Sequence, residues 1–272
     1  NPFFKNTKKI FFSRGDVISI LNVNLPDRTI FQKLKDKIII IIYPLLQRLI
    51  YGKLNLIIFQ ANFLKKNFFR RIKVEKKNSR VLPNDCITQK NFYPRKRLDK
   101  KITIGFAAPM YWSCKGLSII VDLYKKLIKE NIDFDLLLAG DGPHTQKLVS
   151  KLDKISSKKF KWLGWVKDIS LFFKKIDLVI IPSKFDSCPN LLLEAISYRK
   201  IIFASNIMAH KEILKNNEFT FDINKIDELK NKILKFQSSI DYNENLKKKI
   251  VHAYVKNNFN WDKKFLELVE KC

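Results

Sequence analysis

The sequence has few cysteines, and they are scattered. None of the four stands in a C-x-x-C pair or at the spacing of a metal site. This absence argues against a zinc module and indicates reduced thiols in a cytoplasmic protein. No cluster of His, Asp and Glu has metal-ligand spacing either, so we expect no bound metal. The cysteines are Cys86, Cys114, Cys188 and Cys272.

Long apolar runs are lacking as well. The longest, from Ile38 to Leu46, is shorter than the roughly 20 residues that a membrane-spanning helix needs. It also contains Pro44. The sequence therefore predicts no transmembrane helix, and it contains no internal repeat.

Acidic residues are scarce. The chain has 26 Asp and Glu against 53 Lys and Arg, which gives a formal net charge of +27. Such a charge suggests an anionic partner, either a membrane surface or a nucleic acid. The alternative is codon bias in an AT-rich genome, because Lys, Ile, Asn and Phe are abundant while glycine numbers 7 and methionine 2. No nucleic-acid motif occurs, so we expect no nucleic acid and keep the other two alternatives.

Hydrophobic residues, 46% of the chain, are sufficient for a packed core, and 272 residues suffice for two domains. From Lys101 onward, short apolar runs alternate with amphipathic segments. This alternation predicts an α/β fold with a doubly wound parallel sheet. The predicted strands are 102–107, 134–139, 160–163, 177–181 and 201–204, and the predicted helices are 116–129, 143–152, 169–174 and 190–197.

The first part of the chain has the pattern of a partial α/β layer. It ends at a charged segment, 91–100, which contains Pro94 and predicts a domain boundary. The predicted elements are a strand at 16–21, a helix at 31–51, a strand at 55–60 and a basic helix at 62–72. After Leu229 we expect helices at 229–236, 244–257 and 261–270.

The rest of the chain is organised around the stretch from Asp177 to Glu212. Its loop 183–188 follows a predicted buried strand and leads into a helix that can begin after Pro189. Ligands of open α/β sheets bind at the carboxyl ends of strands, and free N–H groups at a helix start bind phosphate. Asp186 and Glu194 lie in this loop and helix. Each alone is explained equally well as a cap or a solvated side chain.

Taken together, this stretch resembles the E-x7-E region of retaining nucleotide-sugar glycosyltransferases of the GT-B fold, the family 4 type. The consensus of that family is close to PS-x-x-E-x-x-P-N-x-x-L-E-A, and Asp186 replaces its first Glu in this sequence. The matching residues are Pro182, Ser183, Asp186, Pro189, Asn190, Leu193, Glu194 and Ala195.

Other segments match the same family. Each alone could be an ordinary strand end or strand-to-helix turn. They are Lys115-Gly116, the GdGP loop at 140–143, the flG-x-v segment at 163–166 and the iPN segment at 81–84. The family's glycine-rich first loop has no counterpart, so we expect a fragment or a divergent, shortened chain.

The resemblance implies two Rossmann-like domains. These are a partial acceptor-side domain at 1–97 and a donor domain at 98–255, with a tail helix at 256–272 that crosses back to the first. It implies that Asp186 and Glu194 are catalytic, with Glu194 on the ribose hydroxyls and Asp186 at the transferred sugar. Lys115 and the helix-start amides would neutralise the leaving diphosphate. The implied donor-binding residues are Lys115, Gly140, Gly142, Val166, Pro189, Asn190, Leu191 and Glu194.

The implied activity is transfer, with retention, of a sugar from a nucleotide diphosphate sugar. The acceptor would be a glycan or a lipid-linked glycan in the synthesis of cell-surface polysaccharide or lipopolysaccharide. We expect the protein in the cytoplasm, with peripheral association at the inner face of the membrane as an option. No cofactor is expected, and the candidate donor loops contain no D-x-D motif that would hold a metal. Two alternatives stay open, an inactive scaffold of the same fold and a basic membrane- or nucleic-acid-binding protein.

Two departures from the family pattern affect the expected diphosphate clamp. Met110 stands where the family usually has an arginine, and Arg199 lies where its usual Gly and Pro are replaced. An arginine binds two oxygens at once, so we expect a weakened clamp that Met110→Arg would tighten. The alternative is that Met110 packs under the next residues while another cation, Lys184 or Arg199, completes the clamp.

Overall fold

A computed structural model of the chain describes residues 8–74, 78–85, 101–256 and 261–270. Its contacts divide the chain into two compact units. The first comprises Asn1–Asp85, Phe185–Cys188 and Phe259–Cys272, and the second comprises Cys86–Lys184 and Pro189–Asn258. The predicted boundary at residue 97 lies outside the described residues.

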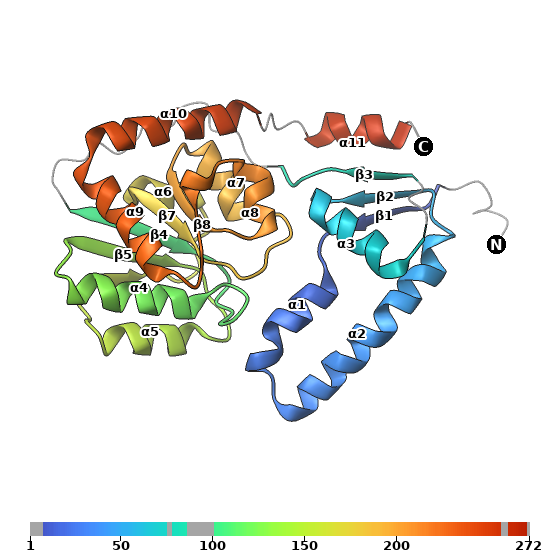
Figure 1. The fold of residues 1–272 in the computed structure, drawn as a ribbon, viewed down its shortest axis with the longest axis horizontal. Coiled ribbons are helices and arrows are strands. Elements are labelled where there is room, and N and C mark those ends of the chain that lie inside the picture. The colour runs from blue at the N-terminus through green and yellow to red at the C-terminus, as the bar shows by residue number, and fades with distance from the viewer. Residues whose placement is uncertain (1–7, 75–77, 86–100, 257–260, 271–272) are drawn as a thin grey trace. The chain divides into compact units, whose positions relative to one another are not determined.

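In the described part of the first unit, three parallel strands pair in sequence order (Figure 1). They are β1 (Ile10–Ser13), β2 (Leu56–Phe59) and β3 (Ser79–Val81). The helices are α1 (Val17–Asn24), α2 (Ile30–Tyr51) and α3 (Asn62–Ile72), with a 3₁₀ turn at Leu25–Asp27. Helices α1 and α2 form a hairpin between β1 and β2, and α3 packs against β2 and β3. The predicted elements at 31–51, 55–60 and 62–72 are confirmed.

The predicted strand at 16–21 is wrong, because these residues begin helix α1. The Asp16 carboxylate caps the helix by accepting from the Ser19 backbone N–H at 3.4 Å and from the Ser19 hydroxyl at 2.8 Å. Such a cap satisfies donors that a helix start leaves free. The apolar run after Asp16 suits a strand or a helix, and the cap favours the helix. The strand lies earlier, at β1, where the sequence analysis predicted none.

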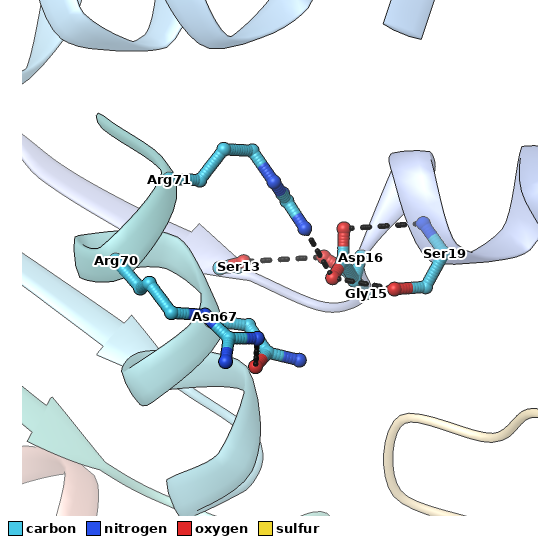
Figure 2. Close-up of polar contacts among 7 residues, drawn as sticks. All are labelled: Ser13, Gly15, Asp16, Ser19, Asn67, Arg70 and Arg71. Atoms are coloured by element: carbon cyan, nitrogen blue, oxygen red, sulfur yellow. Dashed lines mark hydrogen bonds and ion pairs between the residues drawn. The ribbon is translucent and has the colours of Figure 1, made fainter. Parts of the chain in front are cut away.

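Asp16 also ties α1 to α3 through a buried ion pair (Figure 2). The Arg71 guanidinium lies 2.7 Å from its carboxylate, and Asp16 is only 6% exposed. Burial opposes ionisation of Asp16, but the hydrogen bonds from Arg71 and Ser19 outweigh it and lower the pKa of the carboxyl. Asp16 is therefore held as a carboxylate.

Aromatic and aliphatic side chains form the core of the first unit. Phe68 and Phe69 of α3 pack around Phe59 of β2, with ring centroids 5.2 and 6.0 Å from it. Helix α11 (Trp261–Glu270) belongs to the same unit. Its Trp261, together with Phe265 and Leu268, packs against a cluster of Leu56, Ile58 and Leu82.

The second unit is built on a larger sheet. Among its described residues, six parallel strands pair in the order β6-β5-β4-β7-β8-β9 (Figure 1). They are β4 (Ile102–Ala107), β5 (Phe134–Ala139), β6 (Phe160–Trp162), β7 (Leu178–Ile181), β8 (Ile201–Ser205) and β9 (Thr220–Phe221). The predicted parallel α/β sheet is confirmed. Strand β9 was not predicted, and at two residues it is too short to give a pattern.

Helices connect these strands. They are α4 (Leu117–Lys129), α5 (Thr145–Asp153), α6 (Ile169–Lys175), α7 (Asn190–Ser197), α8 (Met208–Leu214), α9 (Ile226–Ser238) and α10 (Ile240–Lys256), with a 3₁₀ turn at Asn217–Phe219. The strands are buried almost throughout, as expected for a parallel sheet covered on both faces. All predicted helices of this unit are found, while α8 was not predicted.

The strand order reverses direction once, between β4 and β7. Strands β4, β5 and β6 follow one another outward on one side, and β7, β8 and β9 do so on the other. The connections that leave β4 and β7 therefore run to opposite sides of the sheet. A crevice at the carboxyl ends of two such strands is the usual ligand site of an open α/β sheet.

Candidate functional site

The loops after β4 and β7 meet at this switch point. The backbone N–H of Lys184 donates to the carbonyl of Cys114 at 2.9 Å. Gly116 has φ 65°, and a Cβ there would lie 2.1 Å from the Pro182 carbonyl oxygen. Only glycine permits this left-handed, close approach. The contact places the backbone before Lys115-Gly116 beside the backbone of the Pro182-Ser183 motif.

The loop after β5 is bonded to the loop after β4. The Met110 N–H donates to the Asp141 carbonyl at 3.0 Å, and the His144 N–H donates to the Met110 carbonyl at 3.1 Å. Gly140 has φ 108°, and a Cβ there would lie 2.1 Å from the Ala108 carbonyl oxygen. The two glycine-containing segments, at 116 and 140–142, are therefore required for close packing of neighbouring loops.

The loop after β6 is bonded to the loop after β5, so the loops after β4, β5 and β6 form a row. The Gly140 N–H donates to the Gly164 carbonyl at 2.7 Å, and the Trp162 indole N–H donates to the Gly140 carbonyl at 2.9 Å. Val166 follows in this loop and is half-buried against the core of the unit. Lys115, Gly140, Gly142 and Val166, which the sequence analysis selected, thus lie on three bonded loops at one edge of the sheet.

Asp141 and His144 hold this edge in shape. The Asp141 carboxylate accepts from the Thr145 hydroxyl and the Gly142 N–H, each at 2.7 Å, and these two bonds lower its pKa. His144 Nδ1 accepts from the backbone N–H of Trp112 at 3.3 Å. The sequence analysis assigned His144 no role. Its place directly after the GdGP loop was the available signal that it ties this loop to its neighbour.

Met110 is fully buried in the core of the unit, at 0% exposure. Its side chain packs inside, away from the solvent-facing edge where a cation would meet a diphosphate. This position supports the second alternative, that Met110 is a packing residue and another cation completes the clamp.

Of the two candidate cations, only Lys184 lies beside Lys115. Lys184 is exposed, and its backbone is bonded to the residue before Lys115. Arg199 follows the last turn of α7, whereas the motif residues Pro189, Asn190 and Leu191 are at its first turn. A helix of eight residues is about 12 Å long, so Arg199 is at the wrong end for a ligand at the helix start.

Glu194 lies in α7, on the helix that starts next to the switch point, and its side chain is half-buried. Burial raises the pKa of the Glu194 carboxyl, and no other cause contributes to the shift. The ionised form therefore lacks the donors that usually compensate a buried carboxylate. Hydroxyl groups of a ligand would supply such donors.

Asp186 belongs to the segment Phe185–Cys188, which groups with the first unit. This segment is bonded to the iPN motif: the Asn84 backbone N–H donates to Cys188 Sγ at 3.4 Å, and its amide donates to the Cys188 carbonyl at 3.2 Å. Asp186 and Glu194, eight residues apart in the sequence motif, therefore belong to different units.

A family model supports the grouping that the motifs suggested. The model of "Glycosyl transferases group 1" matches residues 101–239, about half of the chain. The chain belongs to the group 1 glycosyl transferases. The matched range contains the six-stranded sheet of the second unit and the loops that follow β4, β5, β6 and β7.

Two curated relatives from Escherichia coli are similar in sequence. One is a UDP-Gal:alpha-D-GlcNAc-diphosphoundecaprenol alpha-1,3-galactosyltransferase, 27% identical over 53% of this chain and 39% of its own length. The other is the O-antigen biosynthesis glycosyltransferase WclY, 25% identical over 66% of this chain and 54% of its own. This glycosyl transferase chain thus spans about half the length of the curated relatives it matches.

Solved structures confirm the GT-B fold. The Anabaena protein HepE, solved with UDP and glucose, has a TM-score of 0.70 at 14% identity over 99% of this chain and 72% of its own. The lipopolysaccharide outer core galactosyltransferase WaaB has a TM-score of 0.68 at 16% identity over 99% and 77%. At such identities the similarity establishes the fold of this group 1 chain.

Two further features of this glycosyl transferase concern metals and membranes. Among the described residues, no three His, Cys, Asp or Glu side chains are grouped so that they could hold a metal ion. Within the same residues, no helix has both the length and the apolar character needed to cross a bilayer.

Proposed function

We propose that the chain transfers a sugar, with retention, from a nucleotide diphosphate sugar to a glycan acceptor. The observation that carries this proposal is the row of bonded loops at the β4/β7 switch point. In this row the Lys184 backbone is bonded to the residue before Lys115, and the Met110 backbone is bonded to the GdGP loop. The family to which the chain belongs supports the reaction class.

The site suits a leaving diphosphate. Breaking the bond between sugar and phosphate develops negative charge on the diphosphate, and fixed donors that meet this charge lower the barrier. Lys115 supplies an ammonium, a compact charge suited to phosphate. The start of α7, directly after Pro189, supplies helix-end N–H groups at Asn190 and Leu191. Lys184 takes the place of the arginine that Met110 replaces.

We assign Glu194 to the ribose of the donor. A half-buried carboxylate whose pKa is raised by burial gains when two hydroxyls donate to it. Gly140, Gly142 and Val166 line the same edge, where backbone groups can approach the base and the phosphates. Asp186, on the segment that groups with the first unit, is assigned to the transferred sugar.

The donor and acceptor classes follow from the relatives. One relative uses UDP-Gal and an acceptor linked to diphosphoundecaprenol, and another acts in O-antigen biosynthesis. HepE was solved with UDP. We therefore propose a UDP-sugar donor and a lipid-linked glycan acceptor in the synthesis of surface polysaccharide. A protein with such an acceptor would work peripherally at the inner face of the membrane.

An inactive scaffold of the same fold is the second candidate. It is favoured by the substitution of the family's first Glu by Asp186. An inactive scaffold would still bind nucleotide but would not turn over a donor.

Calorimetry with UDP, UDP-galactose, GDP-mannose and ADP-glucose tests the proposal. We expect saturable binding of the uridine compounds and a weaker response to the others. Glu194→Ala should weaken binding about tenfold or more, because a charged hydrogen bond contributes about 1.5–3 kcal/mol. Glu212→Ala, outside the edge loops, is the matched control. Folded protein that binds none of the four would refute the proposal.

Turnover distinguishes the enzyme from the scaffold. Release of UDP from UDP-galactose in the presence of a diphosphoundecaprenol-linked acceptor is expected, with a rate that EDTA leaves unchanged. Binding without turnover of any acceptor would favour the scaffold. A rate that vanishes with EDTA and returns with manganese would refute the metal-free mechanism.

A further inference from the structure

Helix α2 of the first unit exposes an unusual number of large apolar side chains. They are Ile30, Phe31, Leu34, Ile38, Ile41, Ile42, Leu45, Leu46, Leu49 and Ile50, and their exposed fractions run from 46% to 89%. Single exposed apolar residues are normal on proteins, but a contiguous set on one element marks an interaction surface.

The exposed residues form one continuous stripe. Phe31, Leu34 and Ile38 are spaced by three and four residues, and the spacing continues through Ile42, Leu45 and Leu49. Side chains at such intervals lie above one another on the same side of a helix. The stripe therefore runs along most of α2.

The packed side of α2 mixes polar side chains with the half-buried Ile39 and Ile40. Asp36 is 6% exposed and pairs with Arg28 at 3.2 Å, while Tyr51 is buried against Phe69 with ring centroids 5.6 Å apart. A helix that merely covered a core would bury its leucines and isoleucines and expose these polar groups. Helix α2 instead leaves most of its leucines and isoleucines exposed, so its apolar stripe needs a partner other than the core of its own unit.

Positive charge accompanies the stripe. Lys35, Lys37 and Arg48 are exposed on α2. The acidic residue of the helix, Asp36, is buried and paired. The exposed surface of α2 thus combines apolar side chains with cations and presents no carboxylate. This is the composition of a helix that lies in the interface of an anionic bilayer.

Helix α3 does not offer such a surface, although its sequence is basic. Its Lys65 ammonium donates to the Ser79 carbonyl at 3.0 Å, Arg71 pairs with Asp16 at 2.7 Å, and Arg70 donates to Asn67 at 3.0 Å (Figure 2). Its apolar residues, among them Phe63 and Leu64, are buried in the unit. Lys65 and Arg71 therefore hold α3 within the first unit, and no exposed apolar stripe accompanies its exposed cations Lys66 and Arg70.

We propose that the exposed stripe of α2 inserts into the surface of an anionic membrane, with Lys35, Lys37 and Arg48 on the lipid phosphates. The proposal extends the proposed function, because a lipid-linked acceptor is presented at that surface. The net charge of +27 supports an anionic partner over a second copy of this equally basic chain. Codon bias alone would explain the net charge, but it would not explain an apolar stripe exposed beside the cations.

Co-sedimentation of the full chain with vesicles tests the proposal. Phosphatidylcholine vesicles with and without phosphatidylglycerol are compared at low and high salt. We expect binding to the anionic vesicles that weakens with salt. Leu34→Ser/Leu45→Ser should reduce the partition coefficient by more than about tenfold, because two large apolar side chains no longer insert. Leu171→Ser/Leu266→Ser, which changes two equally exposed leucines elsewhere, should bind as the unmodified chain does.

The cations are tested separately. Lys35→Gln/Lys37→Gln should weaken binding to anionic vesicles severalfold and reduce its salt dependence, whereas Lys125→Gln/Lys129→Gln on α4 should not. Circular dichroism of each variant checks that it is folded. No binding of the unmodified chain, or equal binding of Leu34→Ser/Leu45→Ser, would overturn the proposal.

A protein partner would give a different result. A dimer in light scattering that Leu34→Ser/Leu45→Ser converts to a monomer, without vesicle binding, would assign the stripe to a second copy and overturn the proposal. The vesicle assay needs neither nucleotide nor acceptor. Its failure is therefore distinguishable from a failure of nucleotide binding at the β4/β7 edge.

Discussion

Helices α2 and α4 are both amphipathic, but they place their apolar sides oppositely. Helix α4 buries Leu117, Ile120, Leu123 and Leu127 against the six-stranded sheet of the second unit. Helix α2 keeps Leu34, Ile38 and most of its other large apolar residues in solvent. Periodicity therefore identifies an amphipathic helix but does not specify what covers its apolar side.

The two units also differ in the contacts that stabilise them. The second unit has a large buried cluster and an edge where neighbouring loops are bonded to one another. The first unit relies on a smaller cluster, on aromatic contacts and on a buried ion pair. Variants in matched positions can test this contrast.

The largest effect is expected at Met110 in the core of the second unit. Met110→Arg would bury a guanidinium where a thioether now packs, and this should lower the free energy of unfolding by more than about 3 kcal/mol. Met110→Leu should cost less than about 1.5 kcal/mol. Urea unfolding of both variants decides. A stable Met110→Arg that binds UDP more tightly would restore the interpretation of Met110 as a gap in the clamp.

In the first unit, the buried ion pair between Arg71 and Asp16 should contribute strongly to stability. Arg71→Met leaves the buried Asp16 carboxylate without its cation and should cost about 3 kcal/mol. Arg70→Met, next in sequence but exposed, should change stability by less than about 0.5 kcal/mol. Thermal and urea unfolding measure both.

The pH dependence of the first unit sharpens this prediction. The folded state lowers the pKa of Asp16 below its value in the unfolded chain. Its contribution is therefore present above the unfolded pKa and is lost as the pH falls through the lowered folded pKa. Unfolding measured from neutral to acid pH should show this loss, and Arg71→Met should reduce it. An identical pH profile in the variant would contradict the assignment.

A leucine in each amphipathic helix gives the direct test of the comparison. Leu123→Ala in α4 should lower the free energy of unfolding by about 2–5 kcal/mol, because it leaves a cavity in a buried cluster. Leu34→Ala in α2, from a side chain that is 60% exposed, should change it by less than about 0.5 kcal/mol. Equal losses would mean that the stripe of α2 is covered within the chain.

The smallest stability effect is expected at Glu194, with the opposite sign. Burial raises the folded pKa of this carboxyl, so Glu194 stabilises the fold relatively more at low pH, and this is lost as the pH rises through the raised pKa. Glu194→Gln should therefore raise the melting temperature slightly at neutral pH while weakening UDP binding. A variant that is less stable and binds UDP normally would assign Glu194 to the structure alone.

Much of the second unit was predictable because local patterns agree with the tertiary fold there. The strands at 102–107 and 134–139 coincide with β4 and β5, and the helix at 190–197 coincides with α7. Buried parallel strands are apolar throughout, and Pro189 marks a helix start, so each signal lies within a few residues. The apolar residues after Asp16 are compatible with either a strand or a helix, and the cap formed by the Asp16 side chain favours the helix.

Local residue patterns predicted the alternation of strands and helices from Lys101 onward, the motif residues from Lys115 to Glu194 and the helix at 31–51. Long-range packing made Met110 a core residue, bonded the Lys184 backbone to the loop that contains Lys115, and paired Arg71 with Asp16. It also decided that the apolar side of α2 faces outward. The physical reason is that burial and pairing depend on partners far away in the chain, which a spacing of three or eight residues cannot specify.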